Sequence, residues 1–185
     1  LSNLNKSSAR FDFEKLQWVN RKHISELGSL KLSEILVEYA AEDNIELPSM
    51  DKLQLFSDAY KTRVDDLNSL LERAQLFFSD DLIMDESAAK KYLQSTVLEP
   101  LKDLVRTLEE TNWSPKEINE AIESICSQHH IGFGKIGQPI RVATTGTTIS
   151  PPIDITLSLL QKDVVVSRLE QAIAYIESKS NVAPD

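Results

Sequence analysis

The chain has little cysteine, little glycine and few aromatic residues. Its 185 residues include one cysteine, Cys126, and five glycines, and only 6% are aromatic. A single cysteine excludes an internal disulfide framework and fits a reducing compartment, so we expect a cytoplasmic protein. No apolar run approaches the roughly 18 residues that a membrane span needs, and "LSNLNKSSARF" has no signal-peptide core. The lack of Met at position 1 favours a fragment of a longer protein.

Positive charge is also scarce. The 20 Lys and Arg residues face 29 Asp and Glu residues, and the net charge is −9. A basic field over the whole surface is therefore excluded, and a polyanion would have to meet a local patch. There is no P-loop lysine pattern and no Gly-x-Ser-x-Gly motif. The sequence predicts no catalytic residue.

The hydrophobic pattern predicts helices along nearly the whole chain. Apolar residues recur at steps of three and four, as on one face of an α-helix, in the segments 11–27, 31–43, 49–78, 96–110, 114–128 and 162–178. Ser114, Pro115 and Glu117 form a capping box with proline at the first helical position. Strands do not alternate with helices, so we predict an all-α fold of the helix-bundle or helical-cage type.

The run "FFSDDLIMDESA" marks the best boundary between two helical halves, because it interrupts the helical pattern with acidic and small residues. We expect a first helical subdomain over 1–80 and a second over 81–185.

Residues of the metal-binding type occur close together once. Cys126, His129 and His130 stand at i, i+3 and i+4 and could share a helix face. A zinc site needs a fourth ligand or an open water position, and the chain has no second cluster, so we favour structural roles and predict no metal. His23 lies on the apolar stripe of 11–27 and is expected in the core.

One stretch, 124–153, contains no Asp or Glu, although the chain is acidic. It holds four of the five glycines, together with Lys135 and Arg141, which can pair with phosphates or base edges. Five hydroxyl residues between 144 and 150 add neutral hydrogen-bonding groups. The residues leave two interpretations open: a surface for single-stranded nucleotides, or an ordinary glycine-rich connector between helices.

Four stretches resemble one known family in the correct order. "KIGQPIRVATTGTTISPP" is similar to the C-terminal signature of bacterial-type glutamyl-tRNA synthetases. "NKSSARFDFEKLQWVN" resembles the segment after that family's catalytic half, and "RVDDLNSLLERAQLFF" resembles its middle anticodon-domain helix. "IDITLSLLQKDVVVSRLEQAI" resembles its closing helices, so the resemblance runs from about Asn5 to Ile176.

The resemblance implies that the chain is the C-terminal, tRNA-binding part of a glutamate–tRNA ligase without its catalytic half. That family activates glutamate with ATP and Mg²⁺ and transfers it to the 3′ end of tRNA, while its two helical domains read the anticodon. The implied partner is the anticodon loop of glutamate tRNA. We expect a monomer that binds neither DNA nor a membrane and that has no cofactor or activity of its own.

The resemblance also suggests site residues in the acid-free stretch. Arg141 in "QPIRVA" matches the family's arginine that reads the anticodon loop. Ser150, Pro151 and Ile153 match the loop that packs on the anticodon bases.

A further site residue is implied before this stretch. Arg63 in "TRVDDL" matches the arginine that contacts the first anticodon base, and an arginine here tends to accompany rejection of glutamine tRNA in the family. We expect Arg63 on a helix, with Tyr60 and Val64 on the core side and Asp66 as an alternative ion-pair partner.

A rival interpretation from another class is a helical protein–protein adaptor, with the glycine-rich stretch as a peptide groove. An adaptor would show no preference among RNA sequences.

Overall fold

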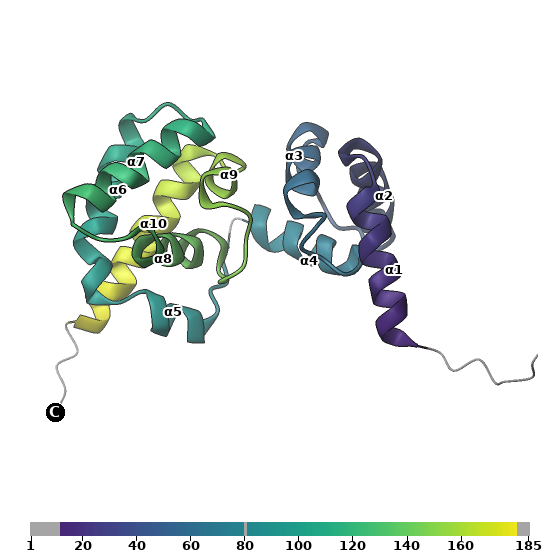
Figure 1. Ribbon diagram of the computed structural model, residues 1–185, viewed down its shortest axis with the longest axis horizontal. Coiled ribbons are helices and arrows are strands. Elements are labelled where there is room, and N and C mark those ends of the chain that lie inside the picture. The colour runs from purple at the N-terminus through teal and green to yellow at the C-terminus, as the bar shows by residue number, and fades with distance from the viewer. Residues whose placement is uncertain (1–11, 80, 181–185) are drawn as a thin grey trace, which may run out of the picture.

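The computed structural model describes residues 12–79 and 81–180, and within them the fold is all-α, as predicted, with no β-strand (Figure 1). No helix in these ranges combines the length and the apolar character needed to cross a membrane. In chain order the elements are α1 (Phe13–Glu26), α2 (Ser29–Glu42), α3 (Met50–Tyr60), α4 (Leu67–Phe78), α5 (Glu86–Tyr92), the 3-10 helix η1 (Ser95–Val97), α6 (Leu98–Glu110), α7 (Pro115–Gln128), α8 (Phe133–Thr145), α9 (Ile153–Ser158) and α10 (Lys162–Ser180).

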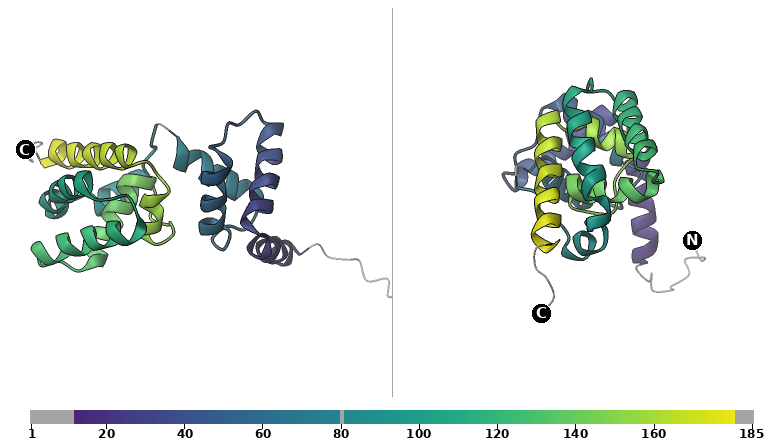
Figure 2. Two further views of the ribbon diagram at one scale, coloured as in Figure 1. Left: turned by 90° about the horizontal axis from the view of Figure 1, so that it is seen from above. Right: turned by 90° about the vertical axis from the view of Figure 1, so that its left-hand side faces the viewer.

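The helices gather into two groups. Helices α1–α4 form an N-terminal group at one end of the molecule, and α5–α10 form a C-terminal group at the other (Figures 1 and 2). In the first group α2 packs on α3 and α4; in the second, α10 packs along α6 and α8, and α7 lies against α6 and α9. Helix α4 is the last helix of the N-terminal group, and the chain enters the C-terminal group between α4 and α5.

Apolar and aromatic side chains hold the N-terminal group together. Leu36 of α2 and Leu53 of α3 are fully buried. The Phe56 ring stacks on Tyr60 with ring centroids 4.3 Å apart and contacts Phe77 of α4 at 5.3 Å. Aromatic pairs of this kind contribute about 0.5–1.5 kcal/mol beyond the area that they bury. The cluster therefore fixes the end of α3 against the end of α4.

The apolar stripe of α1 is not buried, contrary to expectation. Phe13 is 72% exposed and Leu16 is 42% exposed. His23, expected in the core, is also exposed, and Ile24 is the buried residue of this helix. Helical periodicity indicates which face is apolar but not what covers it. At the C-terminal end of the stripe, Leu27 is partly buried against the core.

The predicted helical run 49–78 is broken, and Arg63 lies in the break. Helix α3 ends at Tyr60 and α4 begins at Leu67. The Asp66 carboxylate accepts a hydrogen bond from the Ser69 backbone N–H at 2.8 Å and so caps the start of α4. Hydrogen bonds from Ser69 also hold the pKa of Asp66 below its usual value. An N-cap residue has extended, non-helical backbone angles, as Asp66 does, so α3 cannot continue through Asp66 into α4.

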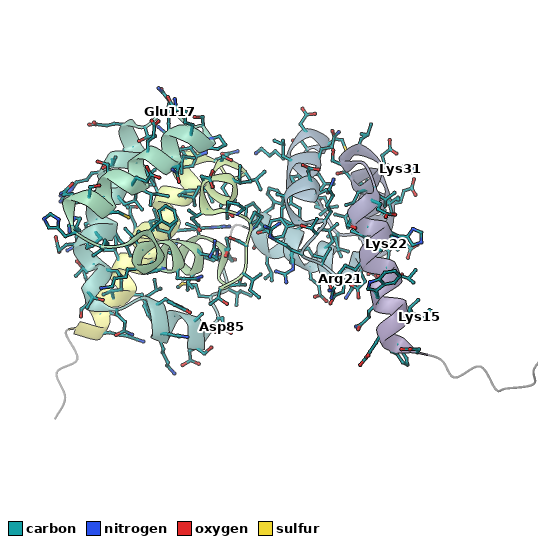
Figure 3. All side chains as sticks on the ribbon, in the orientation of Figure 1. Lys15, Arg21, Lys22, Lys31, Asp85 and Glu117 are labelled. Carbon is teal, nitrogen blue, oxygen red and sulfur yellow. The ribbon has the colours of Figure 1, made fainter. Side chains whose placement is uncertain are left out.

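Side-chain caps begin two helices of the C-terminal group, a hydroxyl at α7 and a carboxylate at α5. The predicted box at α7 is confirmed: Ser114 Oγ donates to Glu117 Oε2 at 2.6 Å and accepts from the Glu117 N–H at 3.4 Å. Asp85 accepts from the Ala88 N–H at 2.7 Å at the start of α5. Figure 3 shows Glu117 and Asp85 at opposite edges of this group. Both starts were therefore specified locally, by residues three positions apart.

One buried arginine of α10 joins the two groups. Arg168 is 3% exposed, and its guanidinium donates to the Thr144 carbonyl at the end of α8 at 2.6 Å. It also donates to the carbonyls of Phe77 and Ser79 at 3.3 and 2.6 Å. Carbonyls at a helix C-terminus have no partner within the helix. Arg168 therefore caps the last helix of the N-terminal group from within the C-terminal group.

We predict that Arg168→Met lowers the free energy of unfolding by at least about 2 kcal/mol, because hydrogen bonds to charged groups contribute about 1.5–3 kcal/mol each. The matched control is Arg106→Met, since Arg106 is 75% exposed and pairs with Asp103 at 3.0 Å on its own helix. Such exposed pairs contribute less than about 1 kcal/mol. Denaturant unfolding measures both values, and equal losses in the two variants would contradict the capping role.

Candidate nucleic-acid interface

The acid-free stretch is mostly helix, not a connector. Residues Phe133–Thr145 form α8 although this helix contains two glycines and Pro139. Ile136, Ile140 and Ala143 are fully buried, and burial of an apolar face stabilises a helix more than its intrinsic propensity does. The connector interpretation was wrong for these residues. The loop proper is 146–152, between α8 and α9.

Gly146 sets the course of this loop. Its φ is +72°, in the left-handed region that favours glycine. A Cβ at this position would lie 2.3 Å from the Ile83 carbonyl oxygen. The Gly146 carbonyl accepts from the Asp85 N–H at 2.9 Å. The turn therefore requires glycine both for its conformation and for its contact with the chain before α5.

Arg141 holds the far end of the same loop. Its Nε donates to Ser150 Oγ at 2.7 Å, and its Nη2 donates to the Pro151 carbonyl at 3.3 Å. Ser150 Oγ also contacts Thr156 Oγ1 at 3.0 Å. Burial lowers the pKa of the half-buried Arg141 guanidinium, which remains charged at neutral pH. The structure thus brings together three residues that the sequence singled out, Arg141, Ser150 and Pro151.

Arg63 faces the same loop from the N-terminal group. It is exposed, and its Nη1 donates to the Ala59 carbonyl at 3.1 Å and to Thr62 Oγ1 at 3.2 Å. The alternative ion pair with Asp66 is absent, because that carboxylate caps α4. Tyr60 and Val64 are buried, as expected, although no helix carries Arg63.

A pocket lies where Arg63 meets the loop. The proline pocket has a volume of about 610 Å³ and is lined by residues of both groups, including Leu55, Ala59, Arg63, Trp113, Pro151 and Ile155. The Trp113 indole N–H donates to the Leu160 carbonyl at 2.8 Å, which holds the ring at the pocket wall. Asp58 also lines the pocket, and its carboxylate pairs with Lys61 at 2.7 Å. Apolar walls with polar groups at the rim suit a flat, polar-edged ligand.

Only Arg63 and Pro151 of the six sequence-derived residues line this pocket, and Arg141, Ser150, Ile153 and Lys135 do not. Ile153 is 3% exposed and packs into the core as the first residue of α9. Lys135 is exposed in the first turn of α8, six residues before Arg141, which places it about 9 Å away along the helix axis. Any contact of either residue with a ligand stays a prediction.

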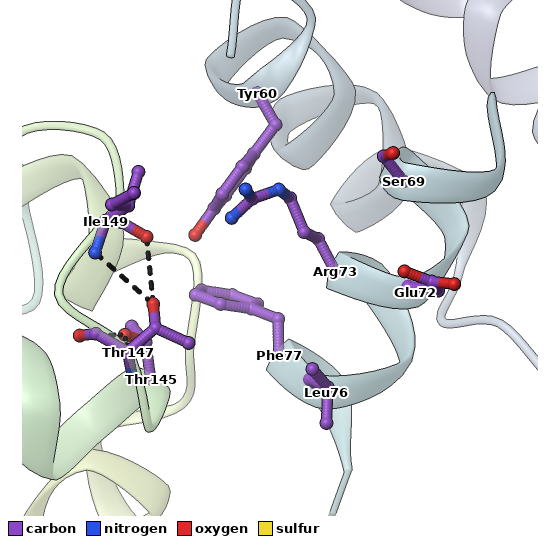
Figure 4. Close-up of a pocket in the computed structure, with 9 residues that line it drawn as sticks. All are labelled: Tyr60, Ser69, Glu72, Arg73, Leu76, Phe77, Thr145, Thr147 and Ile149. Carbon is purple, nitrogen blue, oxygen red and sulfur yellow. Dashed lines mark hydrogen bonds between the residues drawn. The ribbon is translucent and has the colours of Figure 1, made fainter. Parts of the chain in front are cut away.

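A second pocket lies on the other side of the loop. The tyrosine pocket has a volume of about 260 Å³ and is lined by Tyr60, Ser69, Glu72, Arg73, Leu76, Phe77, Thr145, Thr147 and Ile149 (Figure 4). Sequence reasoning placed Tyr60 in the core and did not consider Arg73. The spacing of residues in α4 could have indicated Arg73. It lies three residues after Leu70 and four before Phe77, both buried, so its charge lies beside the apolar face of the helix.

Three arginines gather at this junction without carboxylate partners. Burial raises the pKa of the Tyr60 hydroxyl to about 12, against the smaller opposing effects of the charges of Arg73, Arg141 and Arg63. Within 12–79 and 81–180 none of these three arginines makes an ion pair. By contrast, Arg21 of α1 pairs with Asp65 through Nε at 2.7 Å. The junction is therefore a local positive patch on an acidic protein.

The possible metal cluster does not form. His129 Nε2 lies 2.8 Å from Asp103 Oδ2, and His130 adopts a positive φ at the end of α7. No group of three or more His, Cys, Asp or Glu residues in the described part of the chain is arranged to hold a metal ion. Burial raises the pKa of Cys126, as expected for a small packed residue.

Comparison with known protein families matches residues 30–173 to the model described as "Anticodon binding domain". The chain belongs to this anticodon-binding domain family. The match covers α2–α9, the three arginines of the junction and both pockets. It confirms the nucleotide-binding interpretation at the level of the family and leaves the adaptor without support.

Curated relatives of this anticodon-binding domain are longer proteins. The glutamate–tRNA ligase of Francisella philomiragia is 37% identical over 177 residues, which are 94% of this chain and 38% of that protein. Glutamate–tRNA ligase 1 of Nitrosococcus oceani is 31% identical over 182 residues, or 98% of this chain and 39% of that protein. The chain thus spans about two-fifths of the length of these relatives, and the resemblance seen in the sequence is confirmed.

Solved structures agree on the fold. A crystal structure of a glutamate tRNA ligase from Elizabethkingia meningosepticum in complex with its amino acid superposes with a TM-score of 0.81 at 22% identity, covering 92% of this chain and 34% of that one. A glutamate–tRNA synthetase from Elizabethkingia anophelis gives a TM-score of 0.75, also at 22% identity, over 91% of this chain and 33% of that one. These likenesses show the all-α fold.

We predict that Gly146→Ala destabilises the anticodon-binding domain by about 1–3 kcal/mol, because a non-glycine residue would be held in the left-handed region. The clash with the Ile83 carbonyl adds to this cost. The matched control is Gly134→Ala on α8, where an added Cβ meets no atom within 4 Å. Alanine should stabilise that helix by about 0.5–1 kcal/mol. Thermal unfolding of both variants checks the signs, and a Gly146→Ala protein as stable as wild type would refute the turn requirement.

Proposed function

We propose that this anticodon-binding domain binds the anticodon loop of glutamate tRNA and serves a glutamate–tRNA ligase. The observation that carries the proposal is the convergence of Arg63 and Arg141 on the loop 146–152, with no carboxylate partner on either. Arginines without an ion-pair partner beside apolar side chains match the needs of single-stranded RNA, whose bases are read by edge hydrogen bonds and by stacking.

The two arginines have different parts in this proposal. Arg63 lines the proline pocket from an exposed turn and is free to turn its fork toward a base edge. Arg141 first holds Ser150 and Pro151, which shapes the surface that the RNA meets. Its Nη1 has no hydrogen-bond partner among the described residues and remains available to the RNA. Loss of Arg141 should therefore affect both loop order and affinity.

The chemistry of the complete protein is part of the same proposal. Its relatives are named glutamate–tRNA ligases, and activation of glutamate with ATP and Mg²⁺ would belong to the part of such a protein that this chain does not match. We further propose that 1–80 and 81–185 act as two anticodon-binding subdomains of a cytoplasmic monomer.

Binding of short RNAs tests the anticodon role. Arg141→Ala should weaken binding of the glutamate-tRNA anticodon stem-loop by about tenfold or more, because it removes the two loop contacts and the Nη1 donors. A hydrogen bond to a charged group contributes about 1.5–3 kcal/mol. Fluorescence anisotropy measures the affinity. The control variant Arg106→Ala should bind normally, since Arg106 is exposed on α6 and pairs only with Asp103.

The RNA control for this assay is a stem-loop with a permuted anticodon, which should bind more weakly to the wild-type domain. Equal affinity for both RNAs would reject anticodon reading and favour the adaptor. Ser150→Ala helps to separate the two parts of Arg141, because it removes one of the two contacts to the loop but leaves the guanidinium.

Arg63 sets the choice between tRNAs in this proposal. Arg63→Gln in the full-length ligase should reduce its preference for glutamate tRNA over glutamine tRNA, since a neutral amide cannot replace the charged fork. Folding should be unaffected because Arg63 is exposed and bonds only to Ala59 and Thr62. Aminoacylation of the two tRNAs measures the ratio of kcat/KM. Equal charging of both tRNAs by the unmodified enzyme would remove the basis for this role.

A further inference from the structure

We propose that the tyrosine pocket takes one further base of the bound RNA loop, a guanine or cytosine, and that Arg73 and Tyr60 recognise its edge. This inference rests on the proposed function, because it requires the RNA loop to lie at the junction of the two helix groups. It adds a binding site at the Thr147–Ile149 part of the loop 146–152, separate from the proline pocket at Pro151 and Pro152.

Arg73 points into this pocket without a partner. Figure 4 shows its guanidinium beside the Tyr60 ring, between α4 and the loop that carries Thr147 and Ile149. The side chain is half-buried, and no hydrogen bond or ion pair joins it to the other described residues. A guanidinium has five donors in a rigid fork. A half-buried guanidinium with no acceptor on the protein is partly desolvated without a compensating hydrogen bond. This is the state expected of a recognition group before its ligand binds.

Tyr60 supplies a second polar group at a fixed position. Its ring is held by stacking on Phe56, with centroids 4.3 Å apart, and by an edge contact with Phe77 at 5.9 Å. Its hydroxyl has no hydrogen-bond partner among the described residues and points toward the loop with Ile149 (Figure 4). Burial raises the pKa of Tyr60 to about 12, so the hydroxyl stays protonated and can donate as well as accept.

The apolar rim of the pocket suits the faces of a base. Leu76 is 41% exposed and Ile149 is 58% exposed, and they come from opposite sides of the pocket. Exposed apolar side chains beside an arginine favour a ligand with flat faces and a polar edge. A phosphate fits less well, because Glu72 also lines this pocket and adds a negative charge. Glu72 accepts from Asn68 Nδ2 at 2.9 Å rather than neutralising Arg73.

The fork of Arg73 selects among the bases. Two adjacent donors pair best with two adjacent acceptors, which guanine presents at O6 and N7. Cytosine presents a comparable pair at O2 and N3. Adenine places an amino donor beside each of its edge acceptors, and uracil separates its two carbonyls by an N–H. We therefore expect guanine or cytosine in this pocket.

Abasic scanning of the RNA tests the pocket. The wild-type chain and Arg73→Met are titrated with the glutamate-tRNA anticodon stem-loop, intact or with one abasic site at each loop position in turn. We expect Arg73→Met to bind the intact RNA about tenfold or more weakly. At one position, originally guanine or cytosine, the abasic RNA should bind both proteins equally, because the contact is already lost.

Two further variants sharpen the design. Arg73→Lys keeps the charge but not the fork, so it should not restore the loss. Tyr60→Phe keeps the ring and its stacking and should weaken binding at the same loop position. Arg106→Met serves as the remote control, and thermal unfolding should be unchanged in Arg73→Met because Arg73 bonds to no described residue.

Each outcome decides one claim. Unchanged affinity of Arg73→Met for the intact RNA, with Arg141→Ala still weakened, overturns the pocket but not the proposed function. A loss that is the same at every abasic position shows contact with the RNA backbone and also overturns the base pocket. Failure of the wild-type chain to bind any anticodon stem-loop overturns the proposed function, and the pocket proposal with it.

Discussion

The buried guanidinium of Arg168 is the interaction on which the junction depends. It binds the carbonyls of Phe77 and Ser79 at the end of α4 and the Thr144 carbonyl at the end of α8. Helix α4 carries Arg73, and the loop 146–152 begins directly after α8. One side chain therefore sets both walls of the tyrosine pocket. Because hydrogen bonds from a charged donor to buried carbonyls are costly to break, the two helix groups are held at a defined distance.

The charges at this junction oppose one another before any ligand arrives. The charge of Arg63 contributes to lowering the pKa of Arg141, and both act on Tyr60 together with Arg73. Like charges in a partly buried site interact more strongly than in water. In the proposed complex, an anionic RNA would offset this repulsion. Elsewhere on the acidic surface, cations such as Lys31 of α2 already have carboxylate partners.

Local signals in the sequence predicted the helices well and their limits less well. The Ser114 box was readable because all its parts lie within four residues. The break before α4 was missed because Asp66 could equally be a helical ion-pair partner, and only its bond to Ser69 shows that it is a cap. Pro139 and the glycines of α8 suggested a loop, but burial of one face outweighed their poor propensity.

The two parts of the site differ in how much of each could be predicted from the sequence. Arg141 and Ser150 are nine residues apart and lie in one sequence motif, so the sequence could indicate both. Arg73 and Ile149 line one pocket only because two helix groups close on one loop, and no local pattern in the sequence contains both residues. The loop itself is short, turned by Gly146 at one end and tied by Arg141 at the other. Thr147 and Ile149 line the tyrosine pocket and Pro151 and Pro152 line the proline pocket, so one short loop with two fixed ends contributes to both.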